Sequence, residues 1–350
     1  MRFTSLAFIA AATQAQAAPT VVTDIGPVQG IVAAVMGEVG TPDVLIPAGV
    51  DAHDYTMRPS DAARLNDADV VIWVGEGMTP WLEKSVTTLG SSALVLELLD
   101  TSGWVKRATS EAGHEDHDDD HDEHKDHDDD HEDHGEDHDD HEDHDGHDDH
   151  DEHKDHDDDH DDHEDHDDHA GHDHGDVDPH AWLDPTVAAV WAGHVADTLA
   201  QADPANAQTY ADNAAKFGAE LDDTSKQIKS ALASYDGAAL IWPHDAYGYF
   251  AQAFDINSAG SIADASARDP GPAHIAELRD IVRDQDVSCV LTDHEIGEKW
   301  ATLVRDGSSA GTGYLDPLGA AAPAGAGHYT ALITDLAAAI TGCQGHSDTN

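Results

Sequence analysis

Short apolar runs alternate with stretches of helical periodicity in the first hundred residues of the chain. The apolar runs are rich in β-branched residues and predict buried strands at residues 21–23, 44–46, 70–75 and 94–96. Between them, helical patterns cover residues 30–37, 60–66 and 80–89. Strands separated by connections of helix length favour a parallel α/β sheet.

The same alternation returns in the last third of the chain. Strand patterns cover residues 238–242 and 288–292, and helical patterns cover residues 246–254, 272–285 and 328–340. Two helical stretches precede this series, at residues 184–202 and 206–234. The second stretch is long and has no internal proline, so it predicts a rigid connector helix.

We therefore predict a fold of the α/β class, with two parallel-sheet domains joined by a long rigid connector helix. The expected boundaries are residues 18–205 for the N-terminal domain, 206–235 for the connector and 236–350 for the C-terminal domain. Ligands of such folds bind at the carboxyl ends of the strands and in the cleft between domains, so we expect the functional site there.

The alternation is interrupted between Glu111 and Gly175 by a segment made almost entirely of Asp, Glu and His. From His114 to His174 it holds 20 His and 35 acidic residues, and no apolar residue larger than Ala. Such a segment cannot bury enough apolar surface to offset the entropy that ordering would cost. We expect a disordered loop inserted late in the first domain. Residues 120–131 recur identically at 149–160, which indicates that the amount of ligand matters more than its geometry.

The His side chains of this loop are a ligand set for divalent cations, because imidazole favours zinc, nickel or copper over calcium or magnesium. We expect low-affinity metal sites at His114, His117, His121, His124, His127, His131, His134, His138, His141, His144, His147, His150, His153, His156, His160, His163, His166, His169, His172 and His174. The alternative is a solvated acidic spacer that grew by repeat slippage, in which the His residues are incidental.

The charge, the N-terminal residues and the cysteines limit the possible partners and the compartment of the protein. The formal net charge is −57, which does not favour a nucleic-acid partner. An apolar run at residues 6–12 precedes Ala15-Gln16-Ala17, so residues 1–17 are predicted to be a cleaved signal peptide and the protein to be periplasmic. The chain has two cysteines, Cys289 and Cys343, and in an exported protein they favour a disulfide over a metal or catalytic thiol.

Four residues outside the loop carry side chains suited to a metal and lie where a strand gives way to a loop. They are His53, His180, His244 and Asp316. Each of them alone is more often a capping or loop residue than a metal ligand. His194 is expected to be structural, His294 is a weaker candidate at the cleft, and His274, His328 and His346 are expected to be exposed.

The motifs around these four residues, taken together and in this order, resemble the metal-binding cluster A-I solute-binding proteins of bacterial ABC importers. The resemblance is closest to the high-affinity zinc-uptake branch and spans nearly all of the mature chain. The motifs are His-Asp-Tyr followed by Arg-Pro-Ser-Asp, then Asp-Pro-His-x-Trp, His-Asp-Ala-Tyr-Gly-Tyr and Leu-Asp-Pro-Leu-Gly. The acidic His-rich loop also belongs to that branch, and the resemblance implies the pairing of Cys289 with Cys343.

The resemblance implies that the cation is held across the cleft, by His53 and His180 of the first domain and by His244 and Asp316 of the second. Manganese-selective relatives carry Glu at the position of His244, so the His favours zinc. Three His with a carboxylate or a water suit tetrahedral zinc. Some zinc-binding members carry Glu where this chain has Ala52, so Asp316 or a water is expected to complete the site.

We therefore predict a monomeric periplasmic protein that captures Zn²⁺ in the interdomain cleft and delivers it to an inner-membrane ABC permease with its ATPase. The loop would collect zinc at low affinity, and no catalysis is expected. The alternatives are the binding protein of a manganese or nickel importer, and a periplasmic zinc storage or buffer protein. A metallohydrolase is a further alternative, although the chain has no His-Glu-x-x-His motif.

Overall fold

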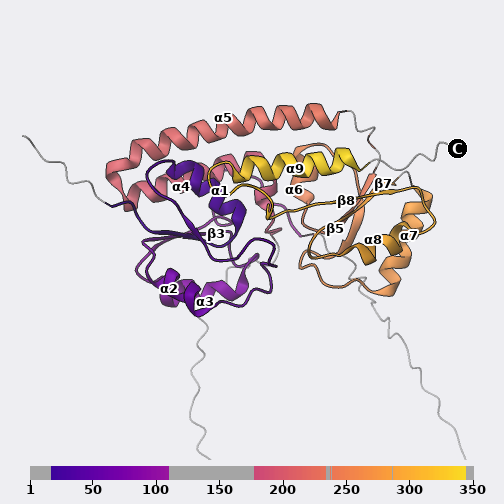
Figure 1. The fold of residues 1–350 in the computed structure, drawn as a ribbon, viewed down its shortest axis with the longest axis horizontal. Coiled ribbons are helices and arrows are strands. Elements are labelled where there is room, and N and C mark those ends of the chain that lie inside the picture. The colour runs from indigo at the N-terminus through magenta and orange to yellow at the C-terminus, as the bar shows by residue number, and fades with distance from the viewer. Residues whose placement is uncertain (1–16, 110–176, 234–236, 238, 286, 344–350) are drawn as a thin grey trace, which may run out of the picture. The chain divides into compact units, whose positions relative to one another are not determined.

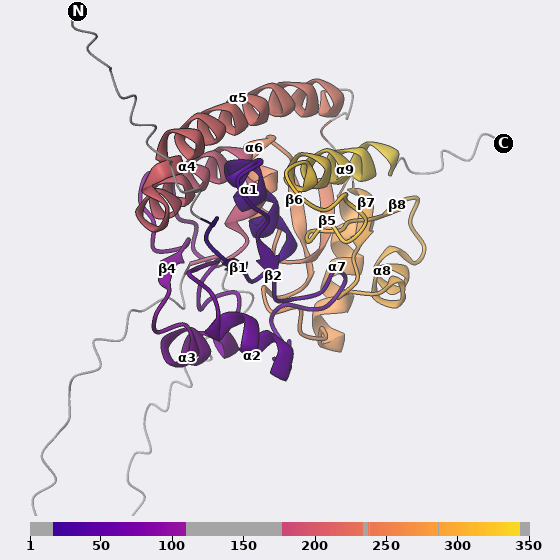
Figure 2. The same cartoon turned by 60° about the vertical axis from the view of Figure 1, so that its left-hand side comes forward.

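Two four-stranded parallel sheets organise the computed structural model of the chain, which describes residues 17–109, 177–233, 237, 239–285 and 287–343 (Figures 1 and 2). All of these residues belong to one compact unit. The predicted signal peptide and the His-rich loop fall almost wholly outside the described residues. No helix within the described ranges is long and apolar enough to span a bilayer.

The first sheet has the strand order β2-β1-β3-β4, and all its pairs are parallel. Its strands are β1 (Val21–Thr23), β2 (Asp43–Val44), β3 (Val70–Trp73) and β4 (Leu94–Glu97). The connecting helices are α1 (Gly26–Met36), α2 (Pro59–Asn66) and α3 (Pro80–Leu89). The central strand β3 is buried throughout, as its unbroken apolar run predicts for a parallel sheet covered on both faces.

The second sheet repeats this arrangement, with the order β6-β5-β7-β8 and parallel pairing throughout. Its strands are β5 (Ala239–His244), β6 (Ser258–Ala263), β7 (Val287–Thr292) and β8 (Gly311–Tyr314). Its helices are α6 (Gly248–Ala253), α7 (Pro272–Asp284), α8 (Glu298–Arg305) and α9 (His328–Gly342). The prediction of two parallel-sheet α/β domains is confirmed. The sequence patterns missed β6 and α8.

Helix α5 (Ala207–Leu232) follows α4 (Pro185–Ala202) and lies between the two sheets in the sequence, where a long connector was predicted. It packs against α4, α1 and α9, and Figures 1 and 2 show it running beside these helices. Its buried residues recur at intervals of three, four or seven, which gives one apolar stripe along the helix. They are Tyr210, Phe217, Leu221, Thr224, Ile228 and Leu232.

The two faces of the second sheet belong to different hydrophobic clusters because side chains alternate along a strand. On β5, Leu240 and Trp242 join the large cluster that also contains the first sheet and α1, α4, α5 and α9. Ile241 between them faces a smaller cluster with α7 and α8. Strand β7 divides in the same way, with Leu291 in the large cluster and Val290 in the smaller one. The second sheet therefore packs against the large cluster on one face and against the smaller cluster on the other.

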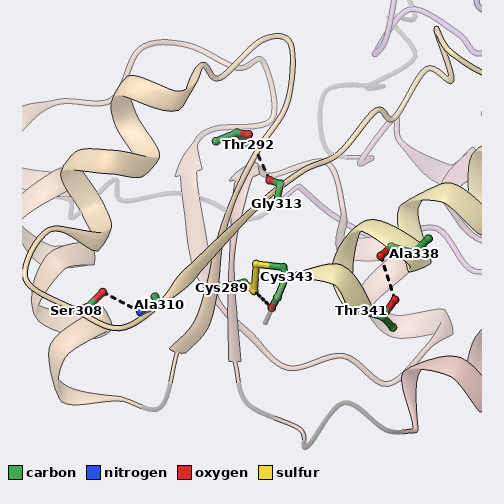
Figure 3. The surroundings of a disulfide bond; sticks show 8 residues. All are labelled: Cys289, Thr292, Ser308, Ala310, Gly313, Ala338, Thr341 and Cys343. Carbon is green, nitrogen blue, oxygen red and sulfur yellow. Dashed lines mark hydrogen bonds between the residues drawn. A yellow bond between two sulfur atoms is a disulfide. The ribbon is translucent and has the colours of Figure 1, made fainter. Parts of the chain in front are cut away.

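A disulfide joins Cys289 of β7 to Cys343 at the end of α9, so this predicted pairing is confirmed (Figure 3). Both residues are buried, and the bond closes a loop over a sequence separation of 54. Because α9 also packs on α1 and α5, the bond ties the second sheet to a helix of the larger cluster.

Candidate metal centre

The carboxyl ends of β5 and β7, in the second sheet, carry one part of the candidate metal site. Strand β5 is followed by β6 on one side of it, whereas β7 pairs on the other side. The chain therefore leaves the neighbouring strand ends in opposite directions, which opens a crevice at the point where the order reverses. His244 is the last residue of β5, and Asp293 directly follows β7.

His244 is fixed in this crevice by Asp293. The Nδ1 atom of His244 lies 2.8 Å from Oδ2 of Asp293, and the hydroxyl of Tyr247 donates to the same oxygen at 3.1 Å. Burial works to lower the pKa of His244, but the hydrogen bond to Asp293 and the charges of Asp293 and Glu295 outweigh it and raise that pKa. The contact leaves Nε2 of His244 as the atom available to a metal.

His180 has the same kind of partner. It precedes the short helix η1 (Ala181–Leu183), and its side chain is 2% exposed. Oδ1 of Asp178 accepts a hydrogen bond from the backbone N–H of His180 at 3.0 Å and lies 2.9 Å from Nδ1 of its ring. The carboxylate of Asp178 thus fixes the orientation of both the backbone and the ring of His180. As in His244, the Nε2 atom does not take part in this contact.

His53 lies in the loop between β2 and α2. Its backbone N–H donates to Oδ1 of Asp51 at 2.8 Å, and the backbone of Met78 hydrogen-bonds its side chain. Burial, together with the positive charge that His180 and His244 can carry, lowers the pKa of His53 to about 3. The ring is therefore neutral at physiological pH, which is the form that binds a metal.

The structure brings these three rings together from separate segments. The ring centroids of His53 and His180 are 5.6 Å apart, and those of His180 and His244 are also 5.6 Å apart. The Nε2 atoms of His53 and His180 are buried and have no hydrogen-bond partner in the structure. A buried polar atom without a partner costs free energy, so such atoms call for an explanation. A cation bound between the rings supplies one.

A carboxylate that the sequence analysis did not single out lies at the same place. Glu295 follows β7 by three residues, and its Oε2 atom is 3.3 Å from Nε2 of His244. Among the described residues, His244, Asp293 and Glu295 form a group whose donor atoms all lie within 4.8 Å of one another. Burial raises the pKa of Glu295. The signal available in the sequence was its place just after the strand predicted at residues 288–292.

The chain also matches known proteins. The family model described as the zinc-uptake complex component A, periplasmic, matches residues 21–343. The chain belongs to this ZnuA family. The resemblance predicted from the motifs is thereby confirmed, and the family is one of solute-binding transport proteins.

Relatives in the ZnuA family cover almost the whole chain. The high-affinity zinc uptake system protein of Paracoccus denitrificans (strain Pd 1222) is 41% identical over 328 residues, which are 93% of this chain and 92% of the relative. The protein of the same name from Brucella abortus (strain 2308) is 38% identical over 323 residues, with 92% and 91% covered.

Two solved structures share the fold of the chain. A crystal structure of ZnuA has a TM-score of 0.68 at 19% identity and covers 93% of this chain and 99% of its own. The periplasmic zinc binding protein TroA from Treponema pallidum also has a TM-score of 0.68, at 18% identity and the same coverage.

Asp316, which the resemblance to the ZnuA family adds as a ligand, lies in the loop after β8. It is half-buried, and its Oδ2 atom accepts a hydrogen bond from the backbone N–H of Ala321 at 3.3 Å. The indole of Trp182 donates to the backbone oxygen of Pro317 at 2.9 Å, so this loop is fixed against the segment that carries His180. The ligand role of Asp316 stays a prediction.

The remaining His residues separate into three groups. His194 and His274 each contact a backbone oxygen, of Ser102 and Ser261 respectively, and they belong to no metal group among the described residues. His328 was expected to be exposed, and this was wrong: it is 6% exposed, and its Nε2 atom lies 3.1 Å from the backbone oxygen of Leu318. It starts α9, whose apolar face draws it into the core. The His residues of the predicted low-affinity sites, and His346, lie outside the described residues.

Proposed function

We propose that the chain is the zinc-binding component of a periplasmic zinc importer, and that it captures Zn²⁺ between His53, His180 and His244. The observation that carries the proposal is the convergence of three imidazoles from separate segments. Two of them, His53 and His180, have a buried Nε2 atom without a partner, and the Nε2 atom of the third, His244, lies 3.3 Å from a buried carboxylate. The relatives from Paracoccus and Brucella are high-affinity zinc uptake proteins, which supports zinc as the cargo.

The donor set favours zinc over the alternatives. Three neutral imidazole nitrogens with one oxygen ligand are typical of tetrahedral zinc, whereas manganese prefers a set richer in oxygen. His244 is decisive here, since a carboxylate at its position would give the harder set. The fourth position belongs to Asp316 or a water in the ligand set taken from the family.

Each half of the proposed site belongs to one proposed domain. Residues 18–205 would supply His53 and His180, residues 236–350 would supply His244, and the connector of residues 206–235 would limit their relative movement. Delivery to an ABC permease with its ATPase, action as a monomer and the absence of catalysis complete the proposal. Cleavage of a signal peptide after residue 17 would bring the chain to the periplasm, an oxidising compartment that suits the disulfide between Cys289 and Cys343.

The loop from Glu111 to Gly175 is proposed to collect zinc at low affinity and to raise its concentration near the tight site. A structural relative, a ZnuA from which an internal segment had been deleted, was solved with zinc bound. Zinc in that shortened relative supports the proposal that the cleft binds the transported ion without the loop.

Calorimetry with Zn²⁺ and Mn²⁺ on the full chain and on a chain lacking residues 111–175 tests this function. We expect one tight zinc per chain in both proteins, a set of weaker sites in the full chain alone, and a preference for Zn²⁺ over Mn²⁺ at the tight site. Many comparable sites and no tight one would favour zinc storage. A preference for Mn²⁺ in the shortened chain would overturn the interpretation of His244.

A further inference from the structure

A single carboxylate holds two potential ligands at the carboxyl end of β7. Oδ2 of Asp293 contacts Nδ1 of His244 at 2.8 Å. The other oxygen, Oδ1, accepts hydrogen bonds from the backbone N–H groups of Glu295 at 3.0 Å and of Ile296 at 2.7 Å. The turn that carries Glu295 is therefore fixed relative to the His244 ring by one buried side chain.

Glu295 and His244 face each other at a distance that a proton or a metal ion can bridge. Their side chains are 6% and 2% exposed, so water does not solvate the facing atoms. Asp293 takes the hydrogen of Nδ1, which leaves a lone pair on Nε2 of the neutral His244 ring. Oε2 of Glu295 has lone pairs too, and it has no hydrogen-bond partner in the structure. Two such atoms at close range repel each other unless a proton on Nε2 or a metal ion lies between them.

Their separation matches one edge of the coordination tetrahedron of zinc, whereas among the described residues neither His53 nor His180 has a donor atom within 4.8 Å of both, so these two rings must approach to bind the same ion. Zinc binds His nitrogen and carboxylate oxygen at about 2.0 Å in a tetrahedron, and two corners of such a tetrahedron are then about 3.3 Å apart. Oε2 of Glu295 and Nε2 of His244 are 3.3 Å apart. The Oδ2 atom of Asp316, in contrast, accepts a hydrogen bond from a backbone N–H of its own loop.

We infer that Glu295, in place of Asp316 or a water, supplies the oxygen ligand that completes the zinc site with His53, His180 and His244. The inference rests on the proposed function and deepens it, because it names the residue that makes the site four-coordinate. Its second oxygen, Oε1, lies 3.5 Å from Nε2 of His294, a residue whose ring nitrogens are both buried without a hydrogen-bond partner.

Zinc affinity of matched variants tests the inference. The full chain receives one equivalent of Zn²⁺ and competes with a chelator of known affinity at constant pH. We expect Glu295→Gln to weaken zinc binding by roughly tenfold to a hundredfold, and Asp316→Asn by less than about threefold. His180→Ala is the control for the proposed function: if it leaves the affinity unchanged, the three-imidazole site itself is wrong. If only His180→Ala weakens binding, the site stands and the role of Glu295 is wrong.

A spectroscopic variant separates ligation from a structural role. In Glu295→Cys loaded with one equivalent of Co²⁺, a thiolate bound to the metal gives a sulfur-to-cobalt charge-transfer band in the near ultraviolet, and a thiol outside the coordination shell gives none. We expect the band in Glu295→Cys and its absence in Asp316→Cys, with a thiol count of one in both proteins to verify that the native disulfide is intact. A band in Asp316→Cys, or no band in Glu295→Cys, overturns the assignment.

Discussion

The carboxylate of Asp293 lies 2.8 Å from the imidazole of His244, although 49 residues separate them in the chain. Both side chains are buried, with 0% of Asp293 and 2% of His244 exposed, so neither group can exchange its partner for water. Burial works to raise the pKa of Asp293, but the hydrogen bond with His244 outweighs it and lowers that pKa. The pair is the orienting contact of the proposed zinc site, since it fixes the ring and directs Nε2 outward.

Replacing Asp293 therefore weakens zinc binding without removing a ligand of the set proposed for this site. We expect Asp293→Asn to reduce the zinc affinity by roughly tenfold to a hundredfold, as the loss of an orienting carboxylate does in other zinc sites. Asp222→Asn, on the exposed side of α5, is the matched control and should leave the affinity unchanged. Equal affinities of Asp293→Asn and the unmodified chain in a chelator competition would contradict this role.

The same pair sets how zinc affinity depends on pH. The folded pKa of His244 is raised, so the ring keeps its proton to a higher pH than an ordinary His does, and that proton competes with zinc. Affinity is expected to be full above this raised pKa and to fall as the pH drops through it. His53, with a pKa of about 3, is already neutral and contributes no competition above pH 4.

Asp293→Asn should move this pH dependence in a defined direction. Without the charge of Asp293, burial of His244 lowers its pKa, so the loss of zinc affinity should begin at a lower pH than in the unmodified chain. Dissociation constants measured between pH 5 and 8, with the His proton resonances followed by NMR in the metal-free protein, check this. An onset at the same or a higher pH would rule out Asp293 as the cause of the raised pKa.

The sequence predicted the parts of the fold that carry strong periodicity. Strand β3 is an unbroken apolar run, and α3 was predicted with the bounds that the structure has, Pro80–Leu89. Strand β6 was missed because Ser258–Ala263 contains one large apolar residue, Ile262, among small ones. Helix α8, Glu298–Arg305, was also missed, although α2 has the same number of residues and was predicted.

Site residues whose partners are close in the sequence could be predicted. Residues that come together only through the pairing of distant strands could not. Motifs picked out His180, whose partner Asp178 is only two residues away. Glu295 comes within 3.3 Å of His244 only because β5 and β7 are neighbours in the sheet, which local sequence cannot reveal. Pairing of strands far apart in the chain depends on the tertiary fold.

Asp61 gives the first domain a stability that depends on pH. It accepts hydrogen bonds from the Tyr55 hydroxyl at 2.7 Å, the Arg58 backbone N–H at 2.9 Å and the Arg64 guanidinium at 2.6 Å. Burial works to raise the pKa of Asp61, but these hydrogen bonds and the charge of Arg64 outweigh it and lower the pKa from 3.8 to about 2. A lowered carboxyl pKa stabilises the fold above the unfolded value, and this stabilisation is lost as the pH falls through the folded value.

Asp61→Asn is therefore expected to lower the free energy of unfolding by about 2 kcal/mol at pH 7, after allowing for the partial exposure of Arg64. The difference from the unmodified chain should shrink as the pH falls from 4 toward 2. Urea unfolding at several pH values measures it. Asp67→Asn, an exposed change at the end of the same helix, is the control, and a difference that stays constant with pH would contradict the explanation.

The disulfide between Cys289 and Cys343 is expected to support the fold more than the zinc site. It closes a loop over a sequence separation of 54, for which the loss of entropy in the unfolded chain predicts a stabilisation of about 4 kcal/mol. Replacing both cysteines with Ser should lower the free energy of unfolding by about 2–4 kcal/mol, because the cross-link no longer restricts the unfolded chain.

The zinc affinity of this double variant should stay within about threefold of the unmodified chain at temperatures where both are folded. Neither Cys is a ligand in the proposed zinc site, because both sulfur atoms are bound in the disulfide. Unfolding in urea and chelator competition on the same samples give the two quantities. The comparison also tests whether the bond positions the site, because Cys289 lies on β7 and Asp293 directly follows that strand. A large loss of zinc affinity in the folded variant would mean that the bond also holds the end of β7, and with it Asp293, in register with His244.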